Sequence, residues 1–368
     1  MIYKVNMEVI FMRNLTKIAI FLFLLAIPFE KINASESAIP LTFSGYVVTQ
    51  GTYNFGDNGG DNANNFYTFS DDESTFTPSA QLGVANDFFV IDALFGSMAS
   101  DLGTGDEEFF LHQAYGILPV GQFTVMIGHM DTMLGNEVIN PGDNPNITRS
   151  FLFGYSINFQ NTGIRAMFVP PMLADEIYIG VSNGSDVIYD EGSDQQKILE
   201  AAAGFTVGEG SLFLAMNYGN DGTDANTIQQ TYTFVYGNTV GPFDVTINGV
   251  YGKETKSDAL DGKWYGYAIY LTKGITDNSS VTARYEYFED KGDTKLGFDD
   301  LDSSFVNSSD DGKLRSFTIT PQMEMGGGIL RAEFRMDFAN FKAFQAGDSS
   351  TVENKSQKTA SLQYIVMF

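Results

Sequence analysis

Apolar and polar residues alternate along much of the chain. In residues 330–338 the apolar side chains occupy every second position, and charged side chains occupy the positions between them. Successive side chains of a β-strand point to opposite faces, so this pattern predicts a strand with one apolar and one polar face. The same alternation recurs at residues 41–47, 243–248 and 281–287. After the N-terminal region no long segment has the helical period of 3.6 residues, which predicts an all-β fold.

The alternation predicts sixteen strands, many of them roughly 9 to 13 residues long, a length suited to a tilted strand that crosses a bilayer. They span residues 39–55, 74–86, 88–99, 107–119, 121–131, 162–170, 174–184, 197–208, 211–220, 228–240, 242–254, 263–275, 279–290, 313–325, 328–341 and 358–368. The apolar run at 151–155 could add a strand but would make the total odd. An even number returns both chain ends to the periplasmic side of a membrane barrel. Fourteen and eighteen strands remain alternatives.

The connections between the expected strands come in two sizes that largely alternate along the chain. Short turns occur near residues 86–87, 119–121, 208–210, 241–242, 276–278 and 326–328, and long polar segments at 56–65, 102–107, 190–195, 256–262, 291–312 and 345–356. Bacterial outer-membrane barrels have short periplasmic turns and long external loops. A soluble β-sandwich also alternates apolar and polar residues, but strand length and this asymmetry favour a transmembrane antiparallel β-barrel.

The N-terminus has the pattern of an export signal. Arg13 and Lys17 precede an uncharged apolar run at 18–29, and small residues follow near Ala34. That order is typical of a cleavable secretory signal, and the run is too short to cross a bilayer comfortably as a helix. The alternative is an N-terminal core helix. We expect a signal peptide at residues 1–34, a barrel at 35–368, and a location in the outer membrane of a Gram-negative bacterium.

The last expected strand ends in an aromatic residue. Phe368 is the terminal residue, and Val366, Tyr364 and Leu362 share its face. This resembles the C-terminal signature by which the outer-membrane assembly machinery recognises barrel proteins. The pattern therefore predicts that these four residues form an assembly signal, with the barrel-assembly machinery and outer-membrane lipid as partners.

Composition narrows the range of functions. The 368 residues include 46 acidic and 21 basic side chains, for a formal net charge of −25, and no cysteine. A protein that binds nucleic acid needs a basic face, so nucleic acid is not an expected partner. Disulfides and cysteine-based metal or redox sites are excluded. The mean hydropathy of −0.09 excludes a helical membrane bundle, but it suits a barrel in which only alternate residues face lipid.

Residue types suited to catalysis are sparse. The chain has two histidines, His112 and His129, and neither adjoins a recognisable nucleophile. There is no phosphate-binding Gly-x-x-x-x-Gly-Lys-Ser/Thr loop. Counting residues does not eliminate the Ser-His-acid triad of a barrel phospholipase. We nevertheless expect no enzyme activity, no catalytic or metal-binding residues and no cofactor.

Residues 131–161 interrupt the regular strand pattern. Positions 140–146 are dense in turn-forming residues and cannot form a regular strand. We expect this segment to fold into the barrel as a constriction loop that carries Asp131, Glu137, Asp143 and Arg149 across the opening. Charge at such a constriction sets ion selectivity. The alternative is an external loop with ordinary solvated charges.

Further charged residues fall on the polar faces of the expected strands. They alternate with apolar residues, so they are candidate pore-lining side chains, and their mixed signs predict pairing along or across strands. The candidates are Arg165, Arg284, Glu286, Arg331, Glu333, Arg335 and Asp337. Such pairs could serve the structure as readily as they serve solute selectivity.

From about residue 108 to residue 190 the sequence resembles a known family. The positions that carry the resemblance are Gln113-Ala114-Tyr115, Gly128, Leu134-Gly135-Asn136-Glu137-Val138, Asn140-Pro141, Asn144-Pro145-Asn146, Arg149-Ser150, Thr162-Gly163-Ile164-Arg165-Ala166 and Asn183-Gly184-Ser185-Asp186. They resemble the OmpL-like β-barrel porins. The chain departs from the family pattern at Asn136, where tyrosine is usual, and at Ser185, where tryptophan is frequent. The resemblance implies a porin-like barrel and names no substrate.

These observations predict an outer-membrane porin through which small hydrophilic solutes or ions diffuse passively. The acidic balance favours a mild cation preference, because a negative wall raises the local cation concentration. The main alternative is a closed barrel whose external loops act as an adhesin or a structural binding surface. A transporter for apolar solutes is a second alternative, but it would need an apolar path. Many large porins are homotrimers, and no outward stripe in the sequence decides whether this chain forms one.

Overall fold

The computed structural model describes residues 40–56, 69, 75–103, 109–188, 197–220, 227–255, 261–298, 311–345 and 352–368. The expected signal peptide at residues 1–34 lies outside these ranges. Within them, no helix has both the length and the apolar character needed to cross a membrane.

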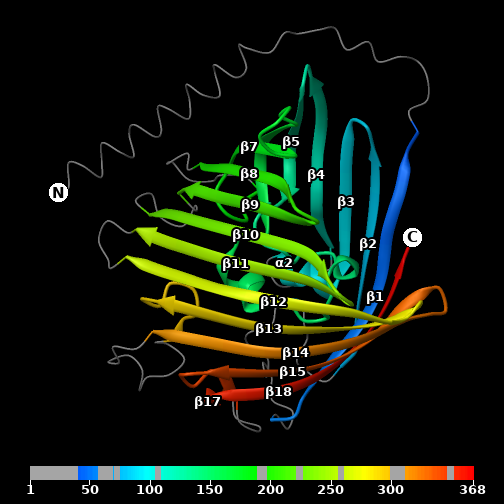
Figure 1. Cartoon of the computed structure of the whole chain (residues 1–368), viewed down its shortest axis with the longest axis vertical. Coiled ribbons are helices and arrows are strands. Elements are labelled where there is room, and N and C mark those ends of the chain that lie inside the picture. The colour runs from blue at the N-terminus through cyan, green and yellow to red at the C-terminus, as the bar shows by residue number, and fades with distance from the viewer. Residues whose placement is uncertain are drawn as a thin grey trace.

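Sixteen antiparallel strands form one closed barrel (Figure 1). The strands are β1 (Thr42–Asn54), β2 (Thr77–Asn86), β3 (Phe89–Gly96), β4 (Phe109–Val120), β5 (Phe123–Asp131), β6 (Gln160–Phe168), β7 (Glu176–Ser182), β8 (Ile198–Val207), β9 (Gly210–Gly219), β10 (Ile228–Val240), β11 (Phe243–Thr255), β12 (Gly262–Thr276), β13 (Ser279–Lys291), β14 (Gly312–Met325), β15 (Gly328–Ala339) and β18 (Ser356–Met367). Each strand pairs with the barrel strands before and after it, and β18 pairs with β1. The predicted number of sixteen is confirmed, and the alternatives of fourteen and eighteen are wrong.

The first and last strands close the barrel. Gln50 of β1 lies opposite Gln363 of β18, and the Gln363 side-chain amide donates to Gln50 Oε1 over 2.9 Å inside the barrel. At the chain end, the backbones of Phe368 and Gly45 exchange two hydrogen bonds of 3.0 Å. Closure pairs the two strands that would otherwise be edges, which a membrane requires because lipid cannot hydrogen-bond to free backbone groups.

Alternate residues of the strands face outward and inward, as the sequence pattern predicts. On β1 the outward Phe43 is 70% exposed, whereas the inward Tyr46 is 1% exposed. On β15 the outward Phe338 is exposed, whereas the inward Arg335 and Asp337 are fully buried. Because these inward charged residues are buried, another part of the chain must occupy the lumen beside β15.

Short and long connections alternate around the barrel. Turns of two residues join β2 to β3, β4 to β5, β8 to β9, β10 to β11, β12 to β13 and β14 to β15. On the same side, seven residues (169–175) join β6 to β7. The connections at the opposite strand ends are longer than the two-residue turns. The predicted alternation is confirmed for these turns.

Two short elements differ from the sequence prediction. The helix α2 (Ser97–Leu102) begins where a strand was expected to continue to residue 99. Gly96 ends β3 with φ of +86°, and a Cβ there would lie 2.3 Å from the backbone oxygen of Pro78, so the chain leaves the sheet at a position that favours glycine. In the last long connection, β16 (Phe344–Gln345) and β17 (Val352–Asn354) pair with each other outside the barrel sheet.

Residues 132–159 form a lumen loop, which lies inside the barrel against inward-facing side chains of the wall. The loop contains η1 (Pro141–Asp143) and η2 (Leu152–Ser156), which is one turn of π-helix. Phe151 and Leu152 are buried in a cluster with inward residues of the wall that include Trp264 and Phe288. The apolar run at 151–155 is therefore packed against the inner wall and does not form a strand.

Candidate functional site

The lumen loop is fastened to β13 and β15 by charged side chains that point inward from these strands, and to β14 by the hydroxyl of Thr320, which accepts from the Asn146 amide over 2.7 Å. Arg284 of β13 forms an ion pair of 2.8 Å with Glu137 of the loop, and it also donates to the backbone oxygen of Thr148 over 2.7 Å. Both side chains of the ion pair are buried. An ion pair held away from water is strong when hydrogen bonds satisfy the remaining groups, so this contact fixes the loop to the wall.

Two carboxylates of the wall accept backbone N–H groups of the loop. Glu333 of β15 accepts from the N–H of Ile147 over 2.7 Å and from the N–H of Thr148 over 3.0 Å. The hydroxyl of Thr148 also donates to Glu333. Glu286 of β13 accepts from the N–H of Phe151 over 2.6 Å. These bonds satisfy backbone donors of an irregular segment that the wall hides from water.

Two arginines of β15 bind backbone oxygens of the loop. Arg335 donates to the oxygen of Arg149 over 2.7 Å and pairs with Asp337 of its own strand over 2.7 Å. Arg331 donates to the oxygen of Pro141 over 2.9 Å. Together with Arg284, these side chains satisfy loop carbonyls, while Glu286 and Glu333 satisfy loop N–H groups.

Within the loop, Arg149 joins two stretches of backbone. Its guanidinium donates to the oxygens of Val138 and Ile139 at 2.9 and 2.6 Å, and to that of Ile147 at 3.0 Å. It also lies 5.8 Å from the ring centroid of Phe153. Burial lowers the pKa of Arg149 to about 10. The guanidinium therefore stays charged at neutral pH and holds the loop in its folded shape.

The turn-forming residues at 140–146 bond locally, as their type predicts. Asn140 Oδ1 accepts from the N–H of Gly142 over 2.9 Å. Asn144 accepts from the N–H of Val138 and donates to the oxygen of the same residue, both over 2.9 Å. Such side-chain bonds replace regular backbone pairing and explain why this stretch bends back inside the barrel.

A cavity of about 380 Å³ lies on the other side of the lumen loop, between the loop and the wall formed by β5, β6, β7 and β9. Its wall side includes Asp131, Arg165, Tyr178 and Phe213, and its loop side is largely apolar. Arg165 pairs with Glu200 of β8 over 2.8 Å and also donates to the backbone oxygen of Asp131. The cavity therefore has an apolar lining with one cation and one exposed anion on its wall.

His112, which contacts the cavity residue Asp131, is held in place by hydrogen bonds. His112 Nε2 lies 2.9 Å from Asp131 Oδ1, and His112 Nδ1 lies 2.7 Å from Gln81 Oε1. Both ring nitrogens are thus engaged by side chains that are not nucleophiles. In the part of the chain that the structure describes, no three His, Asp or Glu side chains are grouped to hold a metal ion.

One short stretch of the sequence matches a hydrolase motif. Residues 180–184 read Gly-Val-Ser-Asn-Gly and fit the pattern Gly-x-Ser-x-Gly. In hydrolases that serine stands on a sharp turn between a strand and a helix. Here Ser182 is the last residue of β7, it is buried, and no helix follows in the described residues up to 188. The match therefore does not form a nucleophile elbow.

The sequence-predicted site residues fall into two groups. Asp131 and Asp143 keep exposed surface. Nine are buried, with 7% or less of their surface exposed: Glu137, Arg149, Arg165, Arg284, Glu286, Arg331, Glu333, Arg335 and Asp337. The loop itself covers most of these nine, which sequence alternation alone could not reveal. Glu200, Tyr178 and Phe213 were missed, although Glu200 occupies an inward position of a regular alternating strand.

The four residues of the predicted assembly signal point outward from β18 or from the chain end. Phe368, Leu362 and Tyr364 are 61%, 42% and 37% exposed, and Val366 is partly exposed. Their inward neighbours Gln363 and Ile365 are fully buried. These four side chains therefore share the surface that faces lipid.

Solved structures of outer-membrane channels have the same fold. An anion-selective porin from Comamonas acidovorans aligns with a TM-score of 0.58 at 13% identity, over 90% of this chain and 100% of that one. The trimer form of OmpT, an outer-membrane protein of Vibrio cholerae, gives 0.59 at 10% identity, over 90% and 100%. The outer-membrane channel DcaP of Acinetobacter baumannii gives 0.58 at 12% identity, over 91% and 99%. At such identities the likeness concerns the fold alone.

The sequence profile of one family covers the whole barrel. The family described as "Putative beta-barrel porin-2, OmpL-like" matches residues 40–368. No curated protein matches the chain. The resemblance carried by residues 108–190 thus extends from the first strand to the last residue. The chain belongs to the OmpL-like β-barrel porin family and is a porin of the Gram-negative outer membrane.

Proposed function

We propose that small hydrophilic solutes and ions diffuse passively through the space between the lumen loop and the wall of β5 to β9. The observation that carries this proposal is the asymmetry of the lumen. A buried ion pair and hydrogen bonds hold one side of the loop against β13 and β15. On the other side Leu134 packs against Ala202 and Ala215, and beside these contacts a cavity of about 380 Å³ lies between the loop and the wall. We therefore assign the loop as the constriction and the cavity as part of the solute path.

We further propose a mild preference for cations. Of the eleven charged residues that the sequence analysis assigned to the pore, the two that keep exposed surface, Asp131 and Asp143, are both acidic. The arginines near them are buried and hydrogen-bonded, as Arg165 is to Glu200. Asp131 lines the cavity of the proposed path. An exposed carboxylate in a narrow path raises the local concentration of cations, whereas buried paired charges contribute little field.

The proposal includes two further points. The chain has no enzyme activity, and it assembles as a homotrimer. The absence of activity is supported by His112, whose two ring nitrogens are occupied by Gln81 and Asp131. The trimer is supported by fold likeness to the trimer form of Vibrio cholerae OmpT. Its partners in the cell would be outer-membrane lipid and, during insertion, the barrel-assembly machinery.

Single-channel recording in planar bilayers under a salt gradient tests the proposal. The purified barrel should give stable conductance with a reversal potential on the cation side. Asp131→Asn and Asp143→Asn should each move the reversal potential towards zero, because each removes an exposed anion. Glu209→Gln is the matched control, since Glu209 is an exposed acid in the two-residue turn between β8 and β9.

Two outcomes would contradict the proposal in different ways. A folded barrel that conducts no current in any salt would exclude diffusion and support the alternative of a closed barrel whose external loops bind a surface partner. A conducting barrel whose reversal potential responds equally to Asp131→Asn and to Glu209→Gln would exclude Asp131 as a determinant of selectivity.

A further inference from the structure

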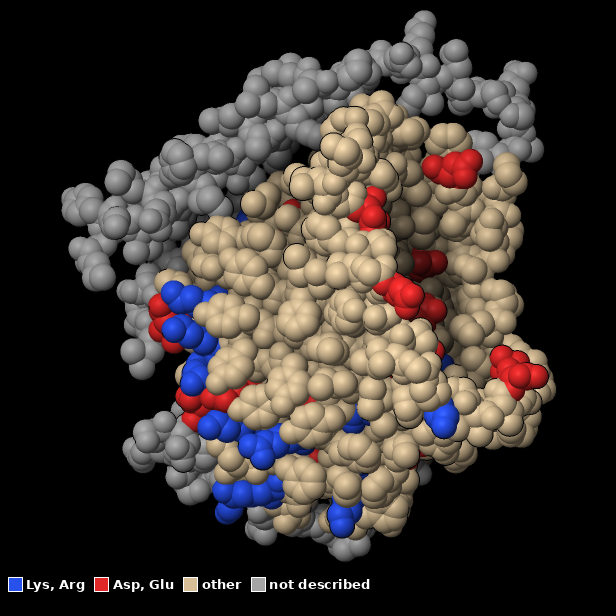
Figure 2. Space-filling view, viewed as in Figure 1, with Lys and Arg blue, Asp and Glu red and all other residues tan. Residues whose placement is uncertain are grey.

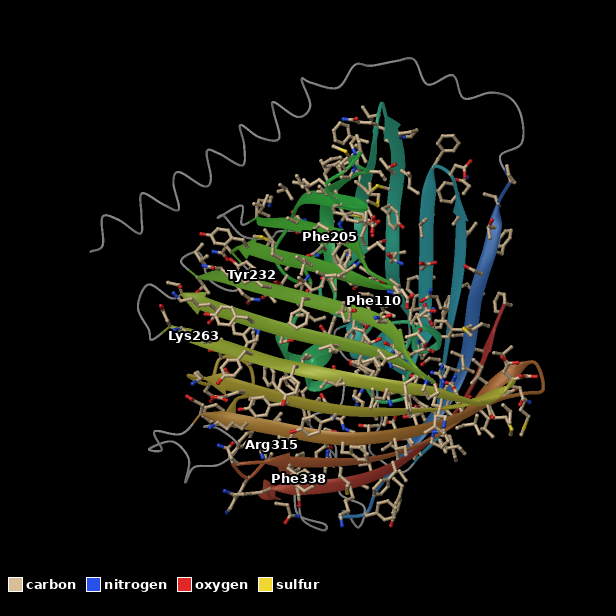
Figure 3. The ribbon with its side chains drawn as sticks, in the orientation of Figure 1. Phe110, Phe205, Tyr232, Lys263, Arg315 and Phe338 are labelled. Atoms are coloured by element: carbon tan, nitrogen blue, oxygen red, sulfur yellow. The ribbon has the colours of Figure 1, made fainter. Side chains whose placement is uncertain are left out.

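Basic side chains gather on the outer wall of the barrel, at the ends of β11 to β14 that carry the long connections (Figure 2). We name this surface the outer basic patch. It consists of Lys253 on β11, Lys263 on β12, Lys291 on β13, and Lys313 and Arg315 on β14. Lys263 and Arg315 both lie on this wall in Figure 3. The concentration of positive charge is notable in a chain whose net charge is −25.

Three lysines of the patch stand side by side across the sheet. Lys253 lies directly opposite Lys263, and Lys263 lies directly opposite Lys291. Like charges in directly opposite positions destabilise a pair of antiparallel strands. Repulsion between these three lysines lowers the stability of the barrel by itself. An anion bound along the row would reduce that repulsion.

Neighbouring acidic side chains neutralise part of the positive charge of this row. Asp261 pairs with Lys253 over 3.1 Å, and Lys291 pairs with Glu289 over 3.3 Å and with Asp311 over 3.1 Å. The remaining members of the patch, Lys263, Lys313 and Arg315, have no ion pair with any residue in the described ranges. Among the described residues, these five cations and three anions give the patch a net charge of +2.

A group of tyrosines lies next to the patch, towards the middle of the same wall. Tyr251 is directly opposite Tyr265, and Tyr267 is directly opposite Tyr287. Tyr251 and Tyr267 are 45% and 40% exposed. Tyrosine belts mark the level of the membrane interface in barrels. The outer basic patch therefore stands at the headgroup level of the external leaflet, where lipid phosphates lie.

We infer that the outer basic patch is a binding site for the phosphate groups of a phosphorylated glycolipid of the external leaflet, of the lipopolysaccharide class. Lys263, Lys313 and Arg315 supply charged donors that form no ion pair with another described residue, and Lys253 and Lys291 lie beside them. The adjacent tyrosines contact the acyl and interfacial part of the same lipid. Arg315 is positioned by Tyr287, whose ring centroid lies 5.7 Å from its guanidinium carbon. This site is independent of conduction through the lumen.

Binding of purified lipopolysaccharide to the full barrel in detergent tests the inference. The dissociation constant is measured with fluorescently labelled lipopolysaccharide, and again with the same material after its phosphates have been removed. We expect dephosphorylation to weaken binding by about tenfold or more, because charge-assisted bonds to phosphate are lost. Inorganic phosphate at millimolar concentration should not compete, since it lacks the lipid part that the tyrosines contact.

A matched pair of variants on one strand locates the site. Lys263→Gln should weaken binding severalfold, and Lys273→Gln should leave it unchanged. Lys273 is an exposed lysine of the same outward face of β12, ten positions along the strand and so about 33 Å away, at the end that carries the two-residue turn. Heat-modifiable migration on gels confirms that each variant is folded before binding is measured.

Three results would overturn the inference. The first is equal affinity for phosphorylated and dephosphorylated lipid. The second is an equal effect of Lys263→Gln and Lys273→Gln. The third is full competition by inorganic phosphate, which would indicate a general anion site. If Lys263→Gln does not fold, the comparison of the two lipids on the unmodified barrel decides the question alone.

Discussion

Arg284 and Glu137 form a buried ion pair of 2.8 Å between residues that are 147 positions apart in the chain. One residue belongs to the barrel wall and the other to the lumen loop. Their pairing joins an irregular segment to a regular sheet at a place that water does not reach. The position of the loop, and therefore the width of the path beside it, depends on such contacts.

Glu137→Gln should lower the free energy of unfolding by about 3 kcal/mol, the scale measured when one partner of a buried ion pair is removed. Arg284 would keep its charge with one fewer anion beside it. Unfolding in guanidinium, followed by tryptophan fluorescence in lipid vesicles, measures the change. The control is Asp261→Asn, which breaks the partly exposed pair with Lys253 and should cost less than about 1 kcal/mol. Equal effects of the two substitutions would contradict the role of the buried pair.

Glu333→Gln should loosen the loop without opening the barrel. Each carboxylate oxygen now accepts a hydrogen bond from one backbone N–H of the loop. The amide nitrogen that replaces one oxygen is a donor and cannot accept, so one N–H would lose its partner at a cost of about 1 to 3 kcal/mol. We expect larger current fluctuations and a higher mean conductance in single-channel recordings. Glu324→Gln changes an exposed acid next to the two-residue turn that follows β14 and should leave the recordings unchanged. Identical traces for both variants would show that Glu333 does not hold the loop.

Gly252→Ala should displace Trp264, the single tryptophan of the chain. The two residues face each other across β11 and β12, and a Cβ on Gly252 would lie 1.9 Å from the indole ring. Trp264 is fully buried, and its N–H donates to the oxygen of Ser156 in the loop over 3.1 Å. We expect red-shifted emission and a loss of about 1 to 3 kcal/mol from overpacking.

Gly274→Ala is the control for that substitution, because a Cβ at Gly274 would have no neighbour within 4 Å. Its emission spectrum and unfolding midpoint should match those of the unmodified protein. An unchanged emission spectrum for Gly252→Ala would contradict the close contact between Gly252 and the Trp264 indole.

Phe368→Ala should slow assembly in cells while changing the stability of the finished barrel little. The hydrogen bonds of Phe368 to Gly45 involve backbone atoms, which alanine retains, and the ring itself is 61% exposed. The fraction of heat-modifiable barrel in isolated outer membranes measures assembly, and refolding of purified protein measures stability. Phe43→Ala removes a ring of similar exposure on the outward face of β1. An equal assembly defect in both variants would show that the terminal ring carries no special signal.

The strand plan of the barrel could be read from the sequence with boundaries that differ by only a few residues. The reason is that each barrel strand separates lipid from the lumen, so its side chains must alternate along its whole length. The outward positions of Phe338 and Leu362 followed from that alternation alone. The end of β3 did not, because Gly96 turns the chain away at a contact with Pro78 that is made by a different strand.

The lumen was harder to predict. Alternation places Arg284, Glu286, Glu333 and Arg335 on the inner face, but it does not say which inner positions a loop covers. These side chains were expected to line the pore, and the structure buries them beneath residues 147–151 of the loop. Many of their partners in the loop are backbone groups, which are present at every residue and leave no mark in the sequence.

By itself, the sequence determined the fold class, the number of strands, the side of each strand that faces lipid and the inward turn-rich segment at 131–161. These properties depend on local periodicity and turn chemistry. Only the tertiary structure decided that the loop packs against β13 to β15 and leaves a cavity towards β5 to β9. It also decided that Lys253, Lys263 and Lys291 meet in one row. Those relationships depend on register and long-range contact, which join residues that no local pattern connects.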